Sequence, residues 1–444
     1  MPKHSVLFRI PTPELLPKPR TGFIIVTEQQ KFRIMLYFAI LTLLAAFFFN
    51  SPLEIFQGLW RIIKSPSILL TDYMVVGNIG SAFFNSGLLM LGAILITRHN
   101  KVTLSGPIVA AIFTIGGFAF FGKNLYNVCP IMAGVLLFAK LRREPFRALI
   151  LPALFGTALG PLVSQITFGF ALPLTISLPL GILSGLVAGM LLPPLANHFI
   201  QFHQGYNLYN IGFTAGIIGM LFISVFRALG FQIPPVSQVL EDHTIGLLVY
   251  LCLLLLSMAA IGFWYARKSW RNMTHLWRMP GQLVSDYINS DGFGLVLLNM
   301  AILGCVSIGY VLFVGSSVSG PVIGGIFTVI GFGAFGKHLR NTVPIMLGVF
   351  VANYVFVWDV SSIGSVLAAL FATTLAPIAG AYGVIPGILA GFIHMTVVMN
   401  VGYLHGGVNL YNNGFSGGFV AALMVPILNS VISVIFPARK DFNQ

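Results

Sequence analysis

Two stretches of this chain repeat each other, and this duplication limits the folds that the chain can adopt. Residues 105–137 align with residues 319–351 without a gap, and 18 of the 33 aligned pairs are identical. The shared pattern is Ser-Gly-Pro, then Gly-Lys-x-Leu-x-Asn, then Pro-Ile-Met-x-Gly-Val. The sequence therefore predicts two copies of one structural unit.

Further landmarks extend the duplication over most of the chain. Matching pairs include Asp72 with Asp286, Asn85 with Asn299, Phe155 with Phe371, Pro161 with Pro377, and residues 203–213 with 405–415. The predicted division is a tail (1–33), copy one (34–228), a linker (229–244), copy two (245–436) and a second tail (437–444).

The composition excludes a soluble protein. Hydrophobic residues make up 57% of the chain, charged residues 8%, and the mean hydropathy is +0.91, whereas soluble domains carry about 25% charged residues. We therefore expect an all-α integral membrane protein in which each copy has about seven apolar segments. In copy one these segments are 34–50, 79–97, 105–121, 128–139, 147–167, 173–195 and 211–228. Residues 51–78 are expected to lie along the membrane surface as an amphipathic helix.

The distribution of positive charge predicts the orientation. With the N-terminus inside and every segment crossing, 18 of the 24 Lys and Arg residues fall on the inside and 3 fall on the outside. This bias fits the positive-inside rule and predicts an inner-membrane protein with both termini in the cytoplasm. The basic loop 140–147 corresponds to 357–362, which has no Lys or Arg. Equivalent loops thus prefer opposite sides, which predicts inverted repeats.

The third and fourth segments of each copy predict a re-entrant hairpin. Residues 128–139 would form a helix of about 18 Å, shorter than the ~30 Å hydrocarbon core. The connection 122–127 is polar. With inverted repeats, the hairpin 105–139 and its counterpart 319–353 enter the membrane from opposite sides. We expect their two tips to meet near the midplane.

The paired tips are the preferred substrate-binding site. Lysine inside a membrane is costly and usually faces a cavity, a partner or a pathway, and asparagine both donates and accepts hydrogen bonds. Such a site would favour an anionic or strongly polar solute. The alternative is that both tips reach an interface, where lysine side chains extend to water. The candidate residues are Lys123, Asn124, Asn127, Lys337, His338, Arg340 and Asn341.

A second candidate is the repeated His-x-Gly-x-Asn-Leu-Tyr-Asn element before each last segment. It could form a gate or vestibule, since histidine can titrate near neutral pH. Alternatively, its asparagines cap the following helices. The candidate gate residues are His203, Asn207, Tyr209, Asn210, His405, Asn409, Tyr411 and Asn412.

Several other classes of function lack support in the sequence. The 11 acidic residues lie mostly in tails and loops, and Asp72 and Asp286 are expected to anchor an interface. No nucleotide-binding loop, nucleophile elbow or zinc-protease motif is present, so we expect neither an enzyme nor a cofactor or metal site. The basic residues form no single face for nucleic acid. The three cysteines are expected to be small buried apolar residues. A coupling ion, Na⁺ or H⁺, and a homo-oligomer remain open.

The duplicated motifs resemble an uncharacterised family of duplicated bacterial multi-pass membrane proteins. The resemblance covers nearly the whole chain and implies no activity. A fainter likeness, carried by Gly80-Ser-Ala-Phe-Phe-Asn-Ser-Gly-Leu-Leu-Met-Leu, is to urea transporters, which also contain inverted repeats. Their Leu-Pro-x-x-Thr-x-Pro-Phe motif is absent from this chain.

We therefore expect a secondary transporter of a small polar or anionic metabolite that works by alternating access in the lipid bilayer. The first alternative is a passive channel or facilitator for a small neutral, urea-like solute. The second is a membrane scaffold without transport activity.

Overall fold

The computed structural model describes residues 25–241 and 245–435, and the regular structure within these ranges is helical, with one isolated β-bridge between Thr71 and Gln238. Eleven helices are long and apolar enough to cross a membrane, and two shorter apolar helices accompany them. The prediction of an all-α, multi-span membrane protein is confirmed. The predicted tails fall mainly on residues 1–24 and 436–444, which lie outside the described residues.

Each copy contributes seven segments in the same order. In copy one these are α1 (Glu28–Phe49), α4 (Ile79–His99), α5 (Gly106–Phe118), α6 (Leu125–Arg142), a broken helix (Phe146–Gly169), α9 (Leu174–Phe202) and α10 (Asn210–Ala228). In copy two they are α11 (Ile245–Ala266), α14 (Phe293–Phe313), α15 (Gly320–Phe332), α16 (Leu339–Val355), a broken helix (Ile363–Tyr382), α19 (Val384–Val401) and α20 (Asn412–Ile435). The short elements between segments one and two are α2 (Pro52–Ile63) and α3 (Tyr73–Val76), with η4 (Arg267–Asn272), α12 (Met273–Leu276) and α13 (Tyr287–Asp291) as their counterparts.

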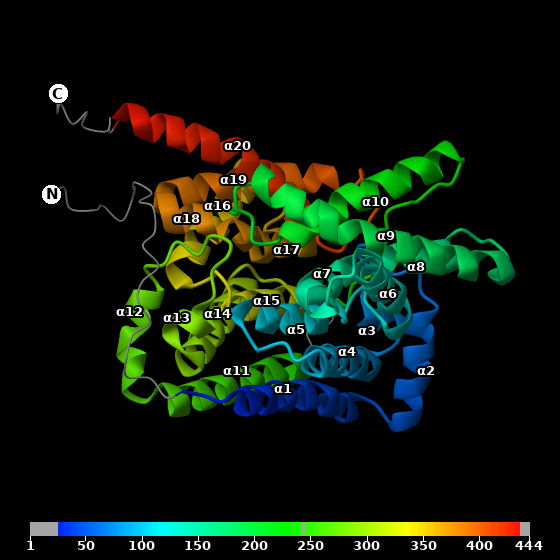
Figure 1. The fold of residues 1–444 in the computed structure, drawn as a ribbon, viewed down its shortest axis with the longest axis horizontal. Coiled ribbons are helices and arrows are strands. Elements are labelled where there is room, and N and C mark those ends of the chain that lie inside the picture. Colours follow the sequence, from blue (N-terminus) through cyan, green and yellow to red (C-terminus); the bar gives the residue numbers. More distant parts are fainter. Residues whose placement is uncertain (1–24, 242–244, 436–444) are drawn as a thin grey trace.

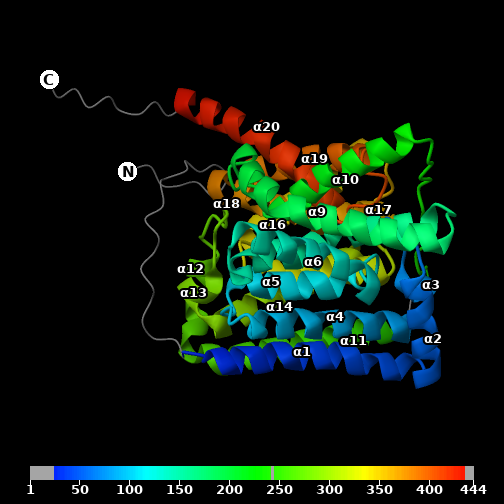
Figure 2. The same ribbon diagram turned by 45° about the vertical axis from the view of Figure 1, so that its right-hand side comes forward.

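Equivalent helices of the two copies run in opposite directions. α1 and α11 lie side by side, and α1 leads to α2 at the right edge of Figure 1, whereas α11 leads to α12 at the left edge. Figure 2 shows the same arrangement from another side. The two copies are therefore related as inverted repeats, and α2 and α12 mark opposite faces of the molecule.

Helices from both copies mix in two bundles. In the first bundle α1 packs on α4, α11 on α14, and α5 on α15; in the second, α6 packs on α9, α16 on α19, and α10 on α20. Figure 1 shows the first bundle below the second. The boundary between the bundles is thus built by both copies.

α2 has the two-sided character predicted for a surface helix. A capping box between Ser51 and Glu54 starts the helix, and Pro52 occupies its first turn, where a missing N–H is tolerated. One apolar side packs inward, while a second set of apolar side chains is exposed. The buried set includes Ile55, Leu59 and Ile62, and the exposed set Leu53, Phe56 and Trp60.

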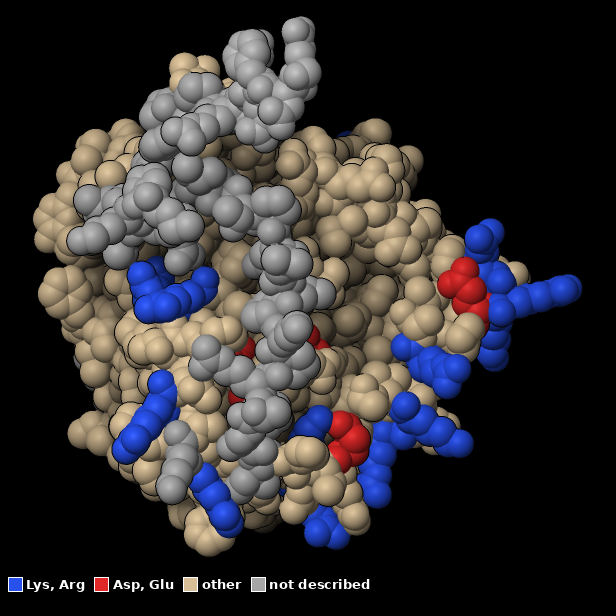
Figure 3. Space-filling model, turned by 60° about the vertical axis from the view of Figure 1, so that its left-hand side comes forward, with Lys and Arg blue, Asp and Glu red and all other residues tan. Residues whose placement is uncertain are grey.

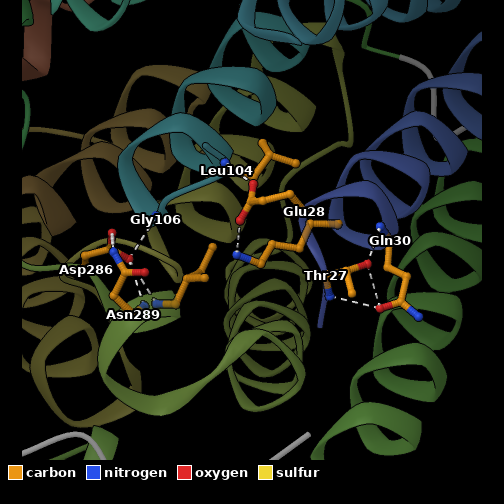
Figure 4. Close-up of polar contacts among 9 residues, drawn as sticks. Thr27, Glu28, Gln30, Leu104, Gly106, Asp286 and Asn289 are labelled. Atoms are coloured by element: carbon orange, nitrogen blue, oxygen red, sulfur yellow. Dashed lines mark hydrogen bonds and ion pairs between the residues drawn. The ribbon is translucent and has the colours of Figure 1, made fainter. Parts of the chain in front are cut away.

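Positive charge gathers on the α12 face. Figure 3, in which this face is turned forward, shows Lys and Arg side chains across it. The α4–α5 loop reaches the start of α1, because the Leu104 N–H donates to the Glu28 carboxylate over 2.9 Å (Figure 4). Arg98 and Lys101, at the end of α4, therefore lie at the same face as the start of α1.

Both broken helices contain a 3₁₀ turn in the middle. In copy one the order is η1 (Phe146–Leu149), α7 (Ile150–Gly156), η2 (Thr157–Leu159), α8 (Gly160–Ser164) and η3 (Gln165–Gly169); in copy two it is α17 (Ile363–Ala372), η5 (Thr373–Leu375) and α18 (Ala376–Tyr382). Pro161 and Pro377 follow the turns and have no N–H to donate. The carbonyls of Ala158 and Thr374 therefore stay available for other donors.

α5 and α15 are short, antiparallel and buried along their entire lengths. Each has 13 residues, about 20 Å of helix. α6 differs from the prediction. It has 18 residues rather than the 12 of the apolar stretch, because polar residues at both ends also belong to the helix. The hairpin thus has one short and one longer arm, and re-entry into the membrane stays a prediction.

The cysteines contradict the expectation of burial. Cys129, Cys252 and Cys305 are all exposed on the protein surface. Cys129 lies on α6 of the second bundle, and Cys252 and Cys305 lie on α11 and α14 of the first. An apolar stretch in a membrane protein can face lipid as well as the core, and the sequence pattern did not distinguish the two cases.

Candidate functional site

The turn between α5 and α6 is held by asparagine side chains. The Asn85 side-chain amide donates to the carbonyls of Ala119 (2.7 Å) and Lys123 (2.8 Å), and that of Asn127 donates to the Gly122 carbonyl (2.8 Å). Gly122 has φ of 103°, a conformation that favours glycine. The result is a rigid turn inside the protein with its backbone carbonyls satisfied.

Copy two repeats this turn with the same contacts. Asn299 donates to the carbonyls of Gly333 and Lys337, both over 2.8 Å, and Asn341 donates to the Gly336 carbonyl over 2.9 Å. Asn85 and Asn299 were not among the predicted site residues, although their match between the copies was visible. They lie on other helices, so spacing along the chain gave no sign of this role.

Lys123 is completely buried and faces aromatic rings. Its Nζ donates to the Tyr411 hydroxyl over 2.7 Å and lies 4.8 Å from the centre of the Tyr411 ring and 5.4 Å from that of Phe118. No ion pair of Lys123 occurs among the described residues. Cation–π contacts of this kind are strongest where water is excluded.

Lys337 occupies the equivalent position in copy two. Its Nζ donates to the Tyr209 hydroxyl and, over 2.7 Å, to the Thr373 hydroxyl. The Nζ lies 4.5 Å from the centre of the Tyr209 ring and 5.0 Å from that of Phe332. Thr373 and its counterpart in copy one, Thr157, both donate to a carbonyl of their own helix, but among the described contacts only Thr373 also accepts from a lysine. Lys337 thus has one hydrogen-bond partner more than Lys123.

The structure joins the two predicted sites to each other but separates the two tips. Each lysine contacts the tyrosine of the other copy's Asn-Leu-Tyr-Asn element. A Cβ on Gly106 would lie 2.1 Å from the Ala334 carbonyl oxygen, and one on Gly320 would lie 2.9 Å from that of Phe120. Each tip therefore lies beside the start of the other copy's short helix. The expectation that the tips meet at one midplane point is wrong, because α5 and α15 pack antiparallel along their lengths.

The remaining tip residues have structural contacts. Asn124 caps α6 and also donates to the Tyr73 hydroxyl over 3.2 Å. The Asn341 side-chain oxygen accepts from the His338 N–H, and the His338 ring lies 2.8 Å from the Met279 carbonyl. Arg340 is exposed and lies apart from the buried group. Of the lysines and arginines among the predicted substrate-binding residues, Lys123 and Lys337 are the ones that lie inside the protein.

The gate elements are mostly braced internally. The His203 and His405 rings lie 2.9 and 2.8 Å from the side-chain oxygens of Asn210 and Asn412. Burial lowers the pKa of His405 to about 4 and also lowers that of His203. Both rings are therefore neutral at neutral pH, and the expectation that these residues titrate there is not supported.

Contacts across the copies hold these elements in place. Asn207 donates to the Gly414 carbonyl (2.9 Å) and Asn409 to the Gly212 carbonyl (3.2 Å). The backbone N–H groups of Leu208 and Leu410 donate to the freed carbonyls of Thr374 and Ala158 in the broken helices. Tyr209 and Tyr411 are thereby positioned against the lysines.

Two cavities lie along the boundary between the bundles. Cavity A has a volume of about 190 Å³, and cavity B about 400 Å³. Cavity A is lined by residues including Leu151, Phe155, Tyr209, Leu283, Phe335, Phe371, Leu410 and Tyr411. Cavity B is lined by residues including Leu69, Phe121, Arg227, Leu367, Phe371, Tyr403, His405 and Leu410.

The two cavities are counterparts under the inverted repeat. Leu283 and Phe335 in cavity A correspond to Leu69 and Phe121 in cavity B, and Leu151 corresponds to Leu367. The cavities therefore lie toward opposite faces. Phe371, Leu410 and Asn413 line both, so these side chains form a shared wall between them.

Comparison with known proteins identifies the duplication independently. The family model described as "Protein of unknown function (DUF1576)" matches residues 51–228 and 265–430, one region in each copy. No curated protein and no solved structure matches the chain at a significant level. The fainter likeness to urea transporters receives no support from these comparisons.

Proposed function

The chain belongs to the DUF1576 family, and we propose that it is a secondary transporter that moves a small polar or anionic metabolite across the inner membrane by alternating access. The observation that carries this proposal is the relation between cavities A and B. They are counterparts under the inverted repeat and share the wall of Phe371, Leu410 and Asn413. Inverted repeats in transporters allow one packing to be exchanged for its mirror arrangement around a fixed site.

The position of the cavities supports a movement of one bundle against the other. Cavity A is lined by α5 and α15 of the first bundle and by α7, α9 and α10 of the second. Rocking about this boundary would widen one cavity while it narrows the other. Solute would then reach the wall from one face at a time.

The buried charges support a polar or anionic solute. Lys123 and Lys337 are fully buried and have no described carboxylate partner. The tyrosines that they contact, Tyr411 and Tyr209, line cavity A. A solute at the wall would therefore meet hydroxyl groups polarised by neighbouring ammonium groups. We propose no enzymatic activity and no resident cofactor.

Reconstitution in liposomes tests the proposal. Uptake of metabolite mixtures would be followed by mass spectrometry with and without an imposed Na⁺ or H⁺ gradient. We expect accumulation above the external concentration when the gradient is present. Equilibrative flux would support the passive facilitator instead, and the absence of flux would support the scaffold.

Single substitutions of the lysines test the role of the buried charge. Lys123→Gln and Lys337→Gln should each lower the uptake rate at least tenfold, because an ammonium group would no longer polarise the tyrosine hydroxyl. Lys140→Gln, at the exposed end of α6, is the matched control and should leave the uptake rate unchanged. Wild-type uptake by well-inserted Lys123→Gln and Lys337→Gln proteins would exclude this role.

A further inference from the structure

Cavity B contains an arginine whose charge is not neutralised by an acidic side chain among the described residues. Arg227, in the last turn of α10, is the one residue with a permanent charge among those that line cavities A and B. The ion pairs of the described residues do not include it. A helix C-terminus stabilises a cation, but this effect alone does not explain why the charge lines a cavity.

The guanidinium is held in a defined orientation. It lies 3.9 Å from the centre of the Tyr403 ring, and Nη2 donates to the Tyr403 carbonyl over 2.8 Å. Stacking on an aromatic face fixes the plane of the group and leaves the other N–H donors directed around its edge. This arrangement suits a carboxylate, which accepts two parallel hydrogen bonds from arginine.

The rest of cavity B suits an apolar body. Leu367, Phe371, Val398 and Leu410 are among the apolar residues that line it. His405, at the same cavity, is neutral because burial lowers its pKa to about 4. A cavity of about 400 Å³ is within the size range of small-molecule sites.

The charge is present on one side only. The counterpart of Arg227 in copy two is Asn429, which accepts a hydrogen bond from the Tyr382 hydroxyl over 2.8 Å and does not line cavity A. The two cavities are therefore counterparts in position and unequal in charge and volume. Recognition of a negative charge would begin at cavity B.

We propose that cavity B binds a small organic monocarboxylate, with the carboxylate on the Arg227 guanidinium and the apolar body against the shared wall. This inference deepens the proposed function and rests on it for its role in transport. Binding itself does not depend on transport. Cavity B thus selects for a carboxylate group joined to a compact apolar body.

Calorimetry on the purified full-length protein in detergent tests this site. The probes are benzoate and hexanoate with their uncharged counterparts, benzamide and hexanamide. We expect both acids to bind at least tenfold more tightly than their amides. Arg227→Gln should remove this preference, and Arg227→Lys should restore it in part, since lysine keeps the charge and loses the planar fork.

Two further variants separate the site from general effects. Arg61→Gln removes a last-turn arginine that donates to the Gly77 carbonyl and lines neither cavity, and it should bind like wild type. Gly364→Leu should weaken binding of both acids by filling cavity B, where a Cβ would have Met399 Cε as its nearest neighbour at 3.8 Å.

The outcomes distinguish this inference from the proposed function. Equal binding of acids and amides, no binding of the acids, or unchanged binding by Arg227→Gln would overturn the carboxylate site. Transport of another solute in the liposome assay would then leave the proposed function intact. Conversely, binding that depends on Arg227 in a protein without flux would retain the site and refute the transporter.

Discussion

At the scale of single residues, the central feature is the pairing of each buried lysine with a tyrosine of the other copy. An ammonium group in a low-dielectric interior is costly unless it is compensated. Here the compensation comes from hydroxyl oxygens and ring faces rather than from carboxylates. In the proposed transporter, such a site would place an amino group beside the solute without a carboxylate to cancel its charge.

The unequal partners of the two lysines predict unequal effects of matched substitutions. Tyr411→Phe removes the described hydrogen bond of Lys123, whereas Tyr209→Phe leaves Lys337 bonded to Thr373. Tyr411→Phe should lower the free energy of unfolding by about 2 kcal/mol, the usual size for a hydrogen bond to a charged group. Tyr209→Phe should lower the free energy of unfolding by less. Thermal unfolding in detergent measures both.

The double variant Tyr209→Phe/Thr373→Val supplies the control. It removes both hydroxyl partners of Lys337 and should lower the free energy of unfolding by at least as much as Tyr411→Phe. A larger loss in Tyr209→Phe than in Tyr411→Phe would contradict the assignment.

Asp72 predicts a dependence of stability on pH. It precedes α3, outside the spanning helices, and burial raises the pKa of its carboxyl to about 6. Because this value exceeds the unfolded value of about 3.9, the fold favours the protonated form. The corresponding stability, up to about 3 kcal/mol, is present below pH 4 and is lost as the pH rises through 6.

Comparison with Asp72→Asn isolates this contribution. The wild-type free energy of unfolding, minus that of Asp72→Asn, should fall between pH 4 and 6 and level off above. A difference that stays constant or rises over this interval would show that the pKa is not raised. The measurement requires reversible unfolding in detergent.

At the scale of elements, the short helices are fixed by residues of the opposite copy. The Asp72 carboxylate accepts from the Gly320 N–H at the start of α15, and the Asp286 carboxylate accepts from the Gly106 N–H at the start of α5, each over 3.0 Å. Figure 4 shows the second of these contacts. Both carboxylates therefore lie at the positive end of a helix dipole, which goes beyond the interfacial anchoring expected from the sequence.

The opposite directions of α6 and α16 predict opposite exposure of their ends. Arg142→Cys and Asp359→Cys, introduced separately after replacement of the three native cysteines by Ser, should react with an impermeant maleimide from opposite faces of the membrane. Both side chains are exposed, so access does not limit the test. Labelling of both from one face would refute the inverted arrangement.

The helical segments could largely be predicted from the sequence, and each prediction that was wrong has a specific physical cause. Apolar runs and the matched landmarks of the two copies predicted seven segments per copy in the correct order. The extent of α6 was underestimated because Asn127 and Lys140 look like loop residues but lie in the helix. The contact of Lys123 with Tyr411 spans 288 positions. Alignment of the copies identifies equivalent residues and does not show which residues touch.

At the scale of the whole molecule, the wall between the cavities would decide whether the proposed transporter holds a solute gradient or leaks. Phe371 lines both cavities and stacks on Phe118, with ring centres 5.3 Å apart. Its counterpart Phe155 lines cavity A alone. The inverted repeat therefore contains one aromatic side chain in the dividing position.

Removal of this side chain should join the cavities. Phe371→Ala is expected to increase passive efflux from preloaded liposomes at least tenfold and to abolish accumulation, because two separate cavities become one. Phe155→Ala is the matched control and should keep the gradient. Unchanged passive efflux with Phe371→Ala, or equal efflux with both variants, would show that the barrier lies elsewhere.

The exchange of contacts between the copies has a consequence for biosynthesis. Copy one leaves the ribosome first, and until copy two is inserted the start of α5 lacks Asp286 and Lys123 lacks Tyr411. Copy one alone therefore leaves the Gly106 N–H and the Lys123 amino group without these partners until copy two is inserted. Because one chain carries both copies, the same ribosome supplies the missing partner in equal amount and soon afterwards. Copy one therefore does not depend on the diffusion of a separate chain through the membrane.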